Sequence, residues 1–120
     1  MSEIVTKKGN KKSHKDLDVW KKSMDLVEEV YLRTDSFPDS EKYGITNQMR
    51  RCAVYIPSNI AQGAGRNSKK ELYISLGSIS ELETQLIISS KLNYLKNKSL
   101  LDELDEIRKM LFGLIKSIKI

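Results

Sequence analysis

Residues 45–70 read ITNQMRRCAVYIPSNIAQGAGRNSKK. Apolar residues recur in this stretch at about every third or fourth position, which is the period of one helix face. The pattern predicts a helix over residues 46–64, with Thr46 as its N-cap. Pro57 lies inside that helix and lacks the N–H that would bond the carbonyl of Ala53, so we expect a kink there. The predicted buried stripe is Ile45, Met49, Cys52, Ile56 and Ile60.

One helix is predicted before this stretch, over residues 16–34, because its apolar side chains also recur at spacings near three and four. It ends ahead of Phe37-Pro38, since the residue before a proline disfavours the helical conformation. The helix over 46–64 is expected to stop at Gly63 and Gly65, because glycine readily adopts the left-handed conformation that follows a helix end. The inward residues of the first helix are predicted to be Val19, Trp20, Val27, Val30 and Tyr31.

Two helices are predicted after the stretch. Ser68 and Glu71 match the capping box S-x-x-E and open a helix over residues 69–92, which Asn93 ends in a left-handed conformation. A last helix over 99–118 carries apolar residues at alternating spacings of four and three, a near-heptad seam. The predicted inward residues are Leu72, Leu76, Ile79, Leu82 and Leu86, with Ile87 at the margin, and Leu100, Leu104, Ile107, Leu111, Leu114 and Ile118.

Four helices with short connections predict an all-α fold, an antiparallel up-down four-helix bundle over residues 16–120. Residues 1–15 are charged and lack an apolar period, so we expect a disordered basic tail. We expect no signal peptide and no membrane contact, because no apolar run approaches the ~18 residues of a membrane span. A single cysteine, Cys52, excludes an internal disulfide and fits the reducing cytoplasm.

Charge is segregated along the chain, whose formal net charge is +5. Residues 42–70 hold six basic and no acidic residues, whereas residues 71–90 hold three glutamates and no base. A concentration of cations favours a polyanion or an acidic partner. The sequence therefore makes RNA or DNA a candidate partner, and the predicted binding residues are Arg50, Arg51, Arg66, Lys69 and Lys70.

A second interpretation pairs the same cations inside the molecule. In an antiparallel hairpin that turns near residues 66–67, Arg51 lies level with Leu82 and within reach of Glu81 or Glu83. Exposed ion pairs contribute only ~0.2–1 kcal/mol, so internal pairing alone does not explain the clustering. Both interpretations stay open from the sequence.

Residues for catalysis are scarce. His14 is the single histidine and falls in the predicted tail, and Cys52 lies on the apolar stripe without a histidine partner. The chain has no Glu-x-x-His motif and no Cys/His cluster for a metal. The run GAGR at 63–66 precedes a helix but lacks the strand and the spaced glycines of phosphate-binding loops. We expect no enzyme activity, no cofactor and no small-molecule substrate.

Three segments carry a resemblance to a known family: DLDVWKKSMDLVEEVY at 16–31, FPDSEKYGITNQMRRCAVYIPSNIAQGAGR at 37–66, and GSISELETQL at 77–86. The chain resembles the bacterial four-helix-bundle family encoded in intervening sequences of 23S ribosomal RNA genes. The resemblance implies an antiparallel four-helix bundle, often assembled as a pentameric ring. It also implies a fold similar to that of the accessory protein of diversity-generating retroelements, which binds a reverse transcriptase and nucleic acid. Gln62 stands where many members have Glu, which removes the one acid that would interrupt the basic stretch.

Two classes of function remain. One is an oligomeric binding module associated with nucleic acid or a ribonucleoprotein. The other is a self-assembling scaffold that binds protein and makes no nucleic-acid contact. Self-assembly has independent support from four large apolar residues that lie off the predicted stripes: Tyr73, Ile74, Ile88 and Phe112. A second copy would shield these side chains from water.

Overall fold

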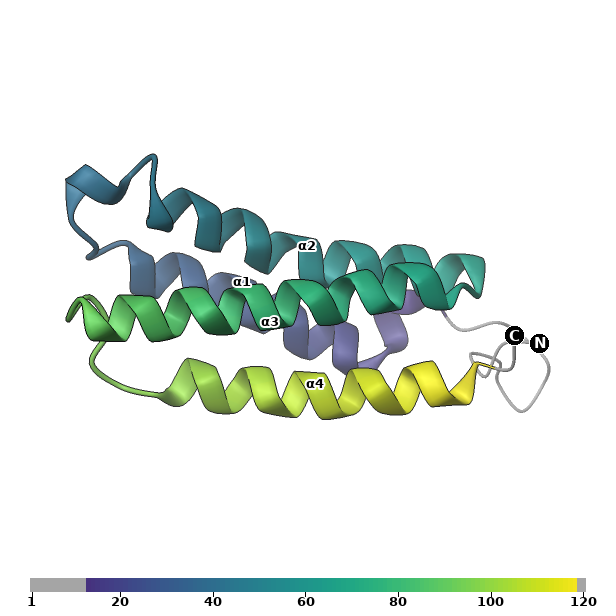
Figure 1. Ribbon diagram of the computed structural model, residues 1–120. Helices are drawn as coiled ribbons and strands as arrows, with labels where there is room; N and C mark the ends of the chain where they lie inside the picture. The colour runs from purple at the N-terminus through teal and green to yellow at the C-terminus, as the bar shows by residue number, and fades with distance from the viewer. Residues whose placement is uncertain (1–12, 119–120) are drawn as a thin grey trace.

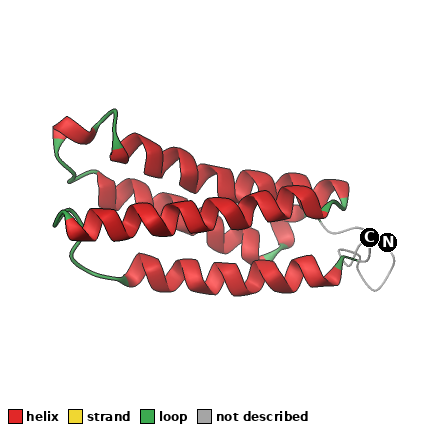
Figure 2. Ribbon diagram, in the orientation of Figure 1, coloured by secondary structure: helices red, strands yellow, loops and turns green. Residues whose placement is uncertain are grey.

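The computed structural model describes residues 13–118, and these residues form four long helices (Figures 1 and 2). Two short 3-10 turns, His14–Asp16 and Asp39–Glu41, precede the first and second of them, and no strand occurs in this part of the chain. The all-α prediction is confirmed, and each helix end lies within two residues of its predicted position. The helices are α1 (Asp18–Thr34), α2 (Ile45–Arg66), α3 (Lys69–Lys91) and α4 (Ser99–Ser117).

Successive helices run in opposite directions, and each packs against two neighbours (Figure 1). α1 contacts α2 and α4, whereas α3 contacts α2 and α4 on the other side. The direction of α3 against α2 follows from two contacts. Cys52 donates to the carbonyl of Ser78 at 3.1 Å, and Ser89 donates to the sulfur of Met49 at 3.4 Å, so the residue number rises in α3 as it falls in α2. α2 and α3 therefore run antiparallel.

The predicted apolar stripes form the core, with two exceptions. Tyr31 and Ile87 were predicted inward but are 44% and 43% exposed. Ile87 follows the buried Leu86, and one residue turns a helix by about 100°, which carries its side chain away from the core. Leu26 and Ile115 are buried although the periodicity did not predict them. Each fully buried Leu or Ile contributes about 1.5–3 kcal/mol of burial free energy.

The C-terminal end of α2 differs from the prediction. Both glycines expected to stop the helix lie inside it; α2 runs on to Arg66, and Asn67 takes the left-handed position with φ 59°. Gly63 is buried because α3 crosses there. A Cβ on Gly63 would lie 2.7 Å from the side chain of Leu72 and 3.0 Å from the carbonyl oxygen of Ser68. The glycine therefore serves close helix packing and not helix termination.

Two of the other predicted caps also need correction. Thr46 lies inside α2, whose N-cap residue is Gly44, and its buried hydroxyl has no hydrogen-bond partner among the described residues. Ser68 is the N-cap residue of α3, but its side chain makes no capping hydrogen bond to the helix backbone. Asn93, predicted as the left-handed stop of α3, has φ 64° and is confirmed.

The end of the predicted tail is ordered. The 3-10 turn His14–Asp16 precedes α1, and the His14 ring packs edge-on against Trp20 with centroids 5.2 Å apart. The rest of the predicted tail, residues 1–12, lies outside the described residues. α2 continues as a helix through Pro57, and the kink expected at that residue stays a prediction.

Candidate functional site

The five cations predicted to bind nucleic acid fall into two separate groups. Arg50 and Arg51 lie in the second turn of α2, whereas Arg66, Lys69 and Lys70 lie at the corner where α2 meets α3. Fifteen residues separate Arg51 from Arg66, which is about 22 Å along a helix. The structure thus splits the run of cations that the sequence places together. We call Arg66, Lys69 and Lys70 the basic corner.

Arg50 belongs to the contact between α1 and α2. Its Nε donates to the Thr34 hydroxyl at 2.9 Å, and one Nη donates to the carbonyl of Tyr31 at 3.3 Å. The guanidinium also lies over the Tyr31 ring, 4.7 Å from the centroid, and 3.8 Å from the carboxylate of Asp35. These contacts hold α2 to the last turn of α1. We therefore assign Arg50 to folding and leave it out of the candidate site.

Arg51 is exposed, and its Nη donates to the Tyr55 hydroxyl at 3.5 Å. The ion pair predicted with Glu81 or Glu83 is wrong: within the described residues Arg51 pairs with neither, and Glu83 instead pairs with Arg108 at 3.1 Å. The predicted register nevertheless holds, because Arg51 and Glu81 line the same small pocket between α2 and α3. Arg51 keeps its charge available to a partner.

The basic corner surrounds the start of α3. Arg66 is mostly exposed, with its guanidinium 4.0 Å from the Glu71 carboxylate, while Lys69 and Lys70 form no ion pair with any described residue. A hydrogen bond from the Ser68 hydroxyl holds the pKa of Glu71 below its usual value, and the backbone N–H of Glu71 and the charges of Arg66 and Lys70 lower it further. The free N–H groups at the start of α3 add positive potential. The corner combines three cations with one carboxylate, which suits an anionic partner.

Cys52 is poorly placed for chemistry. Its thiol is buried against the carbonyl of Ser78, and burial, together with the charge of Glu81, raises the pKa of Cys52 to about 12. A thiol with this pKa stays protonated near neutral pH and is a weak nucleophile. Within residues 13–118, no three His, Cys, Asp or Glu side chains gather closely enough to hold a metal ion.

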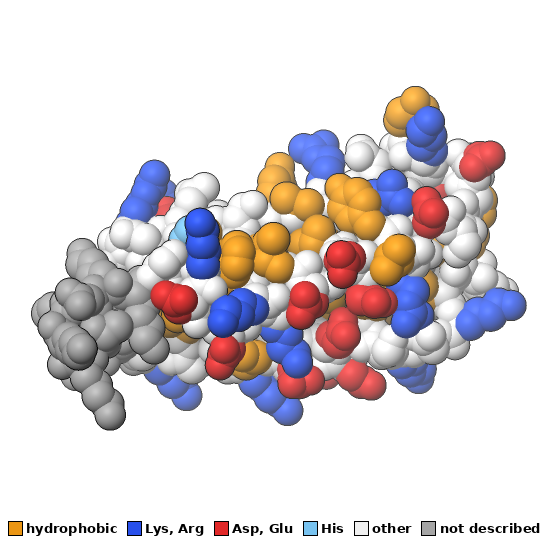
Figure 3. Space-filling model, turned by 180° about the vertical axis from the view of Figure 1, so that it is seen from behind, with side chains coloured by type: hydrophobic (Ala, Val, Ile, Leu, Met, Phe, Trp, Pro, Cys, Tyr) orange, Lys and Arg blue, Asp and Glu red, His pale blue; other side chains and the backbone are white. Residues whose placement is uncertain are grey.

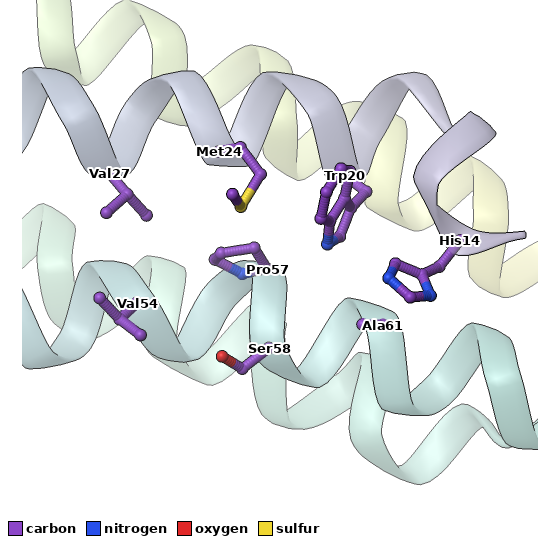
Figure 4. Close-up of a pocket in the computed structure, with 8 residues that line it drawn as sticks. All are labelled: His14, Trp20, Met24, Val27, Val54, Pro57, Ser58 and Ala61. Atoms are coloured by element: carbon purple, nitrogen blue, oxygen red, sulfur yellow. The ribbon is translucent and has the colours of Figure 1, made fainter.

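An apolar groove runs between α1 and α2. Trp20, Met24 and Val27 on α1 face Val54 and Pro57 on α2 across a hollow of about 400 Å³ (Figure 4). Met24 and Val54 are 44% and 37% exposed. Seen from behind the view of Figure 1, hydrophobic side chains gather along the middle of the face (Figure 3). The spacing of residues did not predict this α1–α2 groove, although it predicted Trp20 and Val27 as inward residues of the first helix.

A second apolar surface lies on α3. Tyr73, Ile74, Ile87 and Ile88 are between 42% and 54% exposed and point away from the core. The predicted exposure of Tyr73, Ile74 and Ile88 is confirmed, as is that of Phe112 on α4 at 45%. We call the outward face of α3 from Tyr73 to Ile88 the α3 strip.

A family model described as the 23S rRNA-intervening sequence protein matches residues 15–113. The match spans all four helices except the last residues of α4, and it includes the basic corner, the α1–α2 groove and the α3 strip. No curated protein matches the chain. None of the helices in the described part of the chain is long and apolar enough to cross a membrane.

Proposed function

We propose that this chain, which belongs to the family of 23S rRNA-intervening sequence proteins, is a non-enzymatic binding protein that works as an assembly of identical copies. One observation carries the proposal: large apolar side chains are exposed both along the α1–α2 groove and along the α3 strip. Extended exposed apolar patches on globular proteins mark interaction surfaces. The family resemblance sets the expected number of copies at five.

The chemistry of the described residues supports a binding role over catalysis. The Cys52 thiol is buried and protonated, and the His14 ring packs against Trp20 beside an apolar groove. The cations of the basic corner attract an anion, and the lowered pKa of the Glu71 carboxylate beside them makes it a weak general base at neutral pH. The proposal therefore assigns no catalytic residue and places the protein in the cytoplasm.

Light scattering on the full chain at micromolar concentration tests the assembly. We expect a mass that is a multiple of 13.8 kDa, and five copies give about 69 kDa. A mass of 13.8 kDa at every concentration would remove the proposal, because the apolar surfaces would then be stable in water without a second copy.

A second candidate function is weak, sequence-tolerant binding of nucleic acid. It rests on the basic corner and on Arg51, since Arg51, Lys69 and Lys70 are cations without an acidic partner in the described chain. Assembly would repeat each cation once per copy, and linked weak contacts raise the overall affinity. Three phosphate contacts per copy predict a log–log salt slope of about −2 to −3 for each copy engaged.

An anisotropy titration of single-stranded RNA and of duplex DNA at low salt tests this candidate. Arg66→Glu/Lys69→Glu/Lys70→Glu should abolish binding. The control is Lys96→Glu/Lys98→Glu, which reverses two exposed charges in the loop between α3 and α4 and should leave binding unchanged. If wild type binds neither nucleic acid, the scaffold without nucleic-acid contact is the remaining function. If both variants bind as tightly as wild type, the basic corner is not the binding surface and this candidate is wrong.

A further inference from the structure

We infer that the small pocket between α2 and α3 holds one unstacked guanine base of a single-stranded nucleic acid. The inference rests on nucleic-acid binding, the second candidate function above. It adds a base preference at one position to phosphate contacts that carry no sequence preference. The pocket is lined by Gln48, Arg51, Cys52, Tyr55 and Glu81, and we call it the α2–α3 pocket.

The α2–α3 pocket is a small hollow with a closed floor. Its volume is about 170 Å³, below the ~300–1,000 Å³ of pockets that hold drug-sized ligands. Cys52 is the one buried residue of the lining, and its thiol already donates to the carbonyl of Ser78 at 3.1 Å. The other four lining residues are exposed at the rim. A hollow of this size suits one flat ring system, such as a base, with its sugar and phosphate left outside.

Opposite charges line this hollow from two helices without meeting. Arg51 comes from α2 and Glu81 from α3, and the two form no ion pair in the described part of the chain. The Tyr55 hydroxyl accepts from an Arg51 Nη at 3.5 Å, which orients the guanidinium. The Gln85 Nε2 donates to the Glu81 Oε2 at 3.5 Å, which orients the carboxylate. Both charged groups keep further hydrogen-bonding capacity, so a ligand that carries acceptors and donors can bridge them.

Guanine suits this pair of charges better than the other bases do. Its O6 and N7 are neighbouring acceptors, and an arginine fork contacts both at once. Its N1–H and N2–H groups are neighbouring donors, and a carboxylate accepts from both. Adenine, cytosine, uracil and thymine each lack such a pair of neighbouring donors. The bridge between Arg51 and Glu81 is therefore complete only with guanine.

Tyr55 supplies an aromatic surface beside the two charges. Its side chain is 49% exposed and lies one turn after Arg51 on α2. Unpaired bases stack on tyrosine rings and on arginine planes, and proteins read the free edges of those bases with polar side chains. Gln48, one turn before Arg51, adds an amide to the rim. Because a duplex keeps its bases stacked and paired, this lining favours a single strand.

The outward face of α2 links the pocket to the basic corner. Arg51, Tyr55, Gln62 and Arg66 recur at helical spacings on one exposed face. α2 holds no acidic residue along its length. A strand with one base in the pocket can therefore follow this face to the basic corner, about 22 Å away, with its phosphates near cations at both ends.

Strands that differ at one base test the preference. Fluorescence anisotropy at low salt measures binding of an oligouridine of about ten nucleotides, with a central uridine, guanosine, adenosine or inosine. We expect the guanosine strand to bind about tenfold tighter than the uridine and adenosine strands. Inosine lacks the N2 amine, so its strand should bind with intermediate affinity. The same series in DNA shows which backbone supplies the base, and a guanine preference in either supports the inference.

Glu81→Gln isolates the role of the carboxylate. Glutamine keeps the size of the side chain but replaces one acceptor by a donor, so the guanosine strand should lose its tenfold advantage. Binding of the uridine strand should not weaken, because only a negative charge is removed. Glu28→Gln is the matched control, since it removes the same charge from an exposed position on α1 and should keep the preference.

Arg51→Lys gives a second, independent variant. Lysine keeps the positive charge but lacks the planar fork that contacts O6 and N7 together, so the guanosine preference should again fall. Circular dichroism of each variant verifies that it is folded.

The outcomes separate the inference from the function on which it rests. Equal affinity of wild type for all four strands would overturn the inference and leave sequence-tolerant binding standing. A guanosine preference that survives in both Glu81→Gln and Arg51→Lys would also overturn it, because the preference would then arise outside the α2–α3 pocket. A wild type that binds no strand would refute the inference together with the second candidate function.

Discussion

At the scale of single residues, two adjacent arginines have different roles: one holds the fold together, and the other is available for binding. Arg50 and Arg51 are neighbours in sequence but point about 100° apart on α2. Arg50 turns toward α1 and bonds Thr34 and Tyr31, whereas Arg51 turns outward and meets Tyr55. A run of cations in a helix therefore does not define one surface.

Replacing these arginines should affect stability unequally. Arg50→Ala removes two hydrogen bonds from a charged group that is 28% exposed, so we expect the free energy of unfolding to fall by about 1–2 kcal/mol. Arg51→Ala should change it by less than about 0.5 kcal/mol, because Arg51 is exposed. Urea unfolding at equal protein concentration measures both values. Equal losses of unfolding free energy in the two variants would show that the contacts of Arg50 with α1 do not stabilise the fold.

Two glycines of α2 provide a second test with opposite signs. Gly63→Ala forces a Cβ to 2.7 Å from Leu72, and such overpacking should lower the free energy of unfolding by about 1–3 kcal/mol. Gly65→Ala meets nothing within 4 Å, so it should raise stability by about 0.5–1 kcal/mol through helix propensity. Thermal unfolding of the pair distinguishes close packing from helix termination. A gain in both variants would contradict the close contact at Gly63.

At the scale of helices, the periodicity predicted α2 and α4 better than α1. Met49, Ile56 and Ile60 repeat on one face of α2 without a polar interruption, and all are buried. In α1 the buried face includes Ser23 and Thr34, whose hydroxyls donate to backbone carbonyls in the preceding turn at 2.7 Å each. Because these hydroxyls find hydrogen-bond acceptors within α1, Ser23 and Thr34 can lie in the core. Their polar side chains interrupt the apolar pattern by which the buried face of α1 would be recognised.

Prediction of the candidate site was limited by information that lies between helices. The sequence indicated a basic stretch and apolar residues off the α3 stripe. Those apolar residues are exposed in the structure, and of the basic stretch Arg51, Arg66 and Lys70 are exposed. The destination of Arg50 depends on the last turn of α1, and the α1–α2 groove depends on how Trp20 and Val54 face each other. The spacing of residues within one helix does not predict which residues of two different helices face each other.

The start of α3 has a predictable response to pH. The pKa of Glu71 is lowered in the folded protein, so the ionised carboxylate contributes stability above the unfolded value of about 4.3. This contribution is lost as pH falls through the lower pKa of the folded state. Wild type should therefore be more stable than Glu71→Gln at pH 7, and the difference should shrink below about pH 4. Urea midpoints of both proteins between pH 3 and 7 measure it, and a constant difference would contradict the assignment.

At the scale of the whole molecule, the bundle has a covered core and two uncovered apolar sides. The core explains why a single copy folds, and the α1–α2 groove and α3 strip explain why single copies should associate. The basic corner lies at one end of the bundle, where α2 meets α3, so assembly would bring copies of Arg66, Lys69 and Lys70 to a shared end of a ring. Assembly is thus the premise of both the scaffold and the nucleic-acid hypotheses.

The native mass spectrum of the wild-type chain tests this premise most directly. We predict one dominant species at a multiple of 13.8 kDa, expected at five copies and about 69 kDa, which persists on dilution through the micromolar range. A spectrum that contains only the 13.8 kDa chain under these conditions would contradict self-assembly.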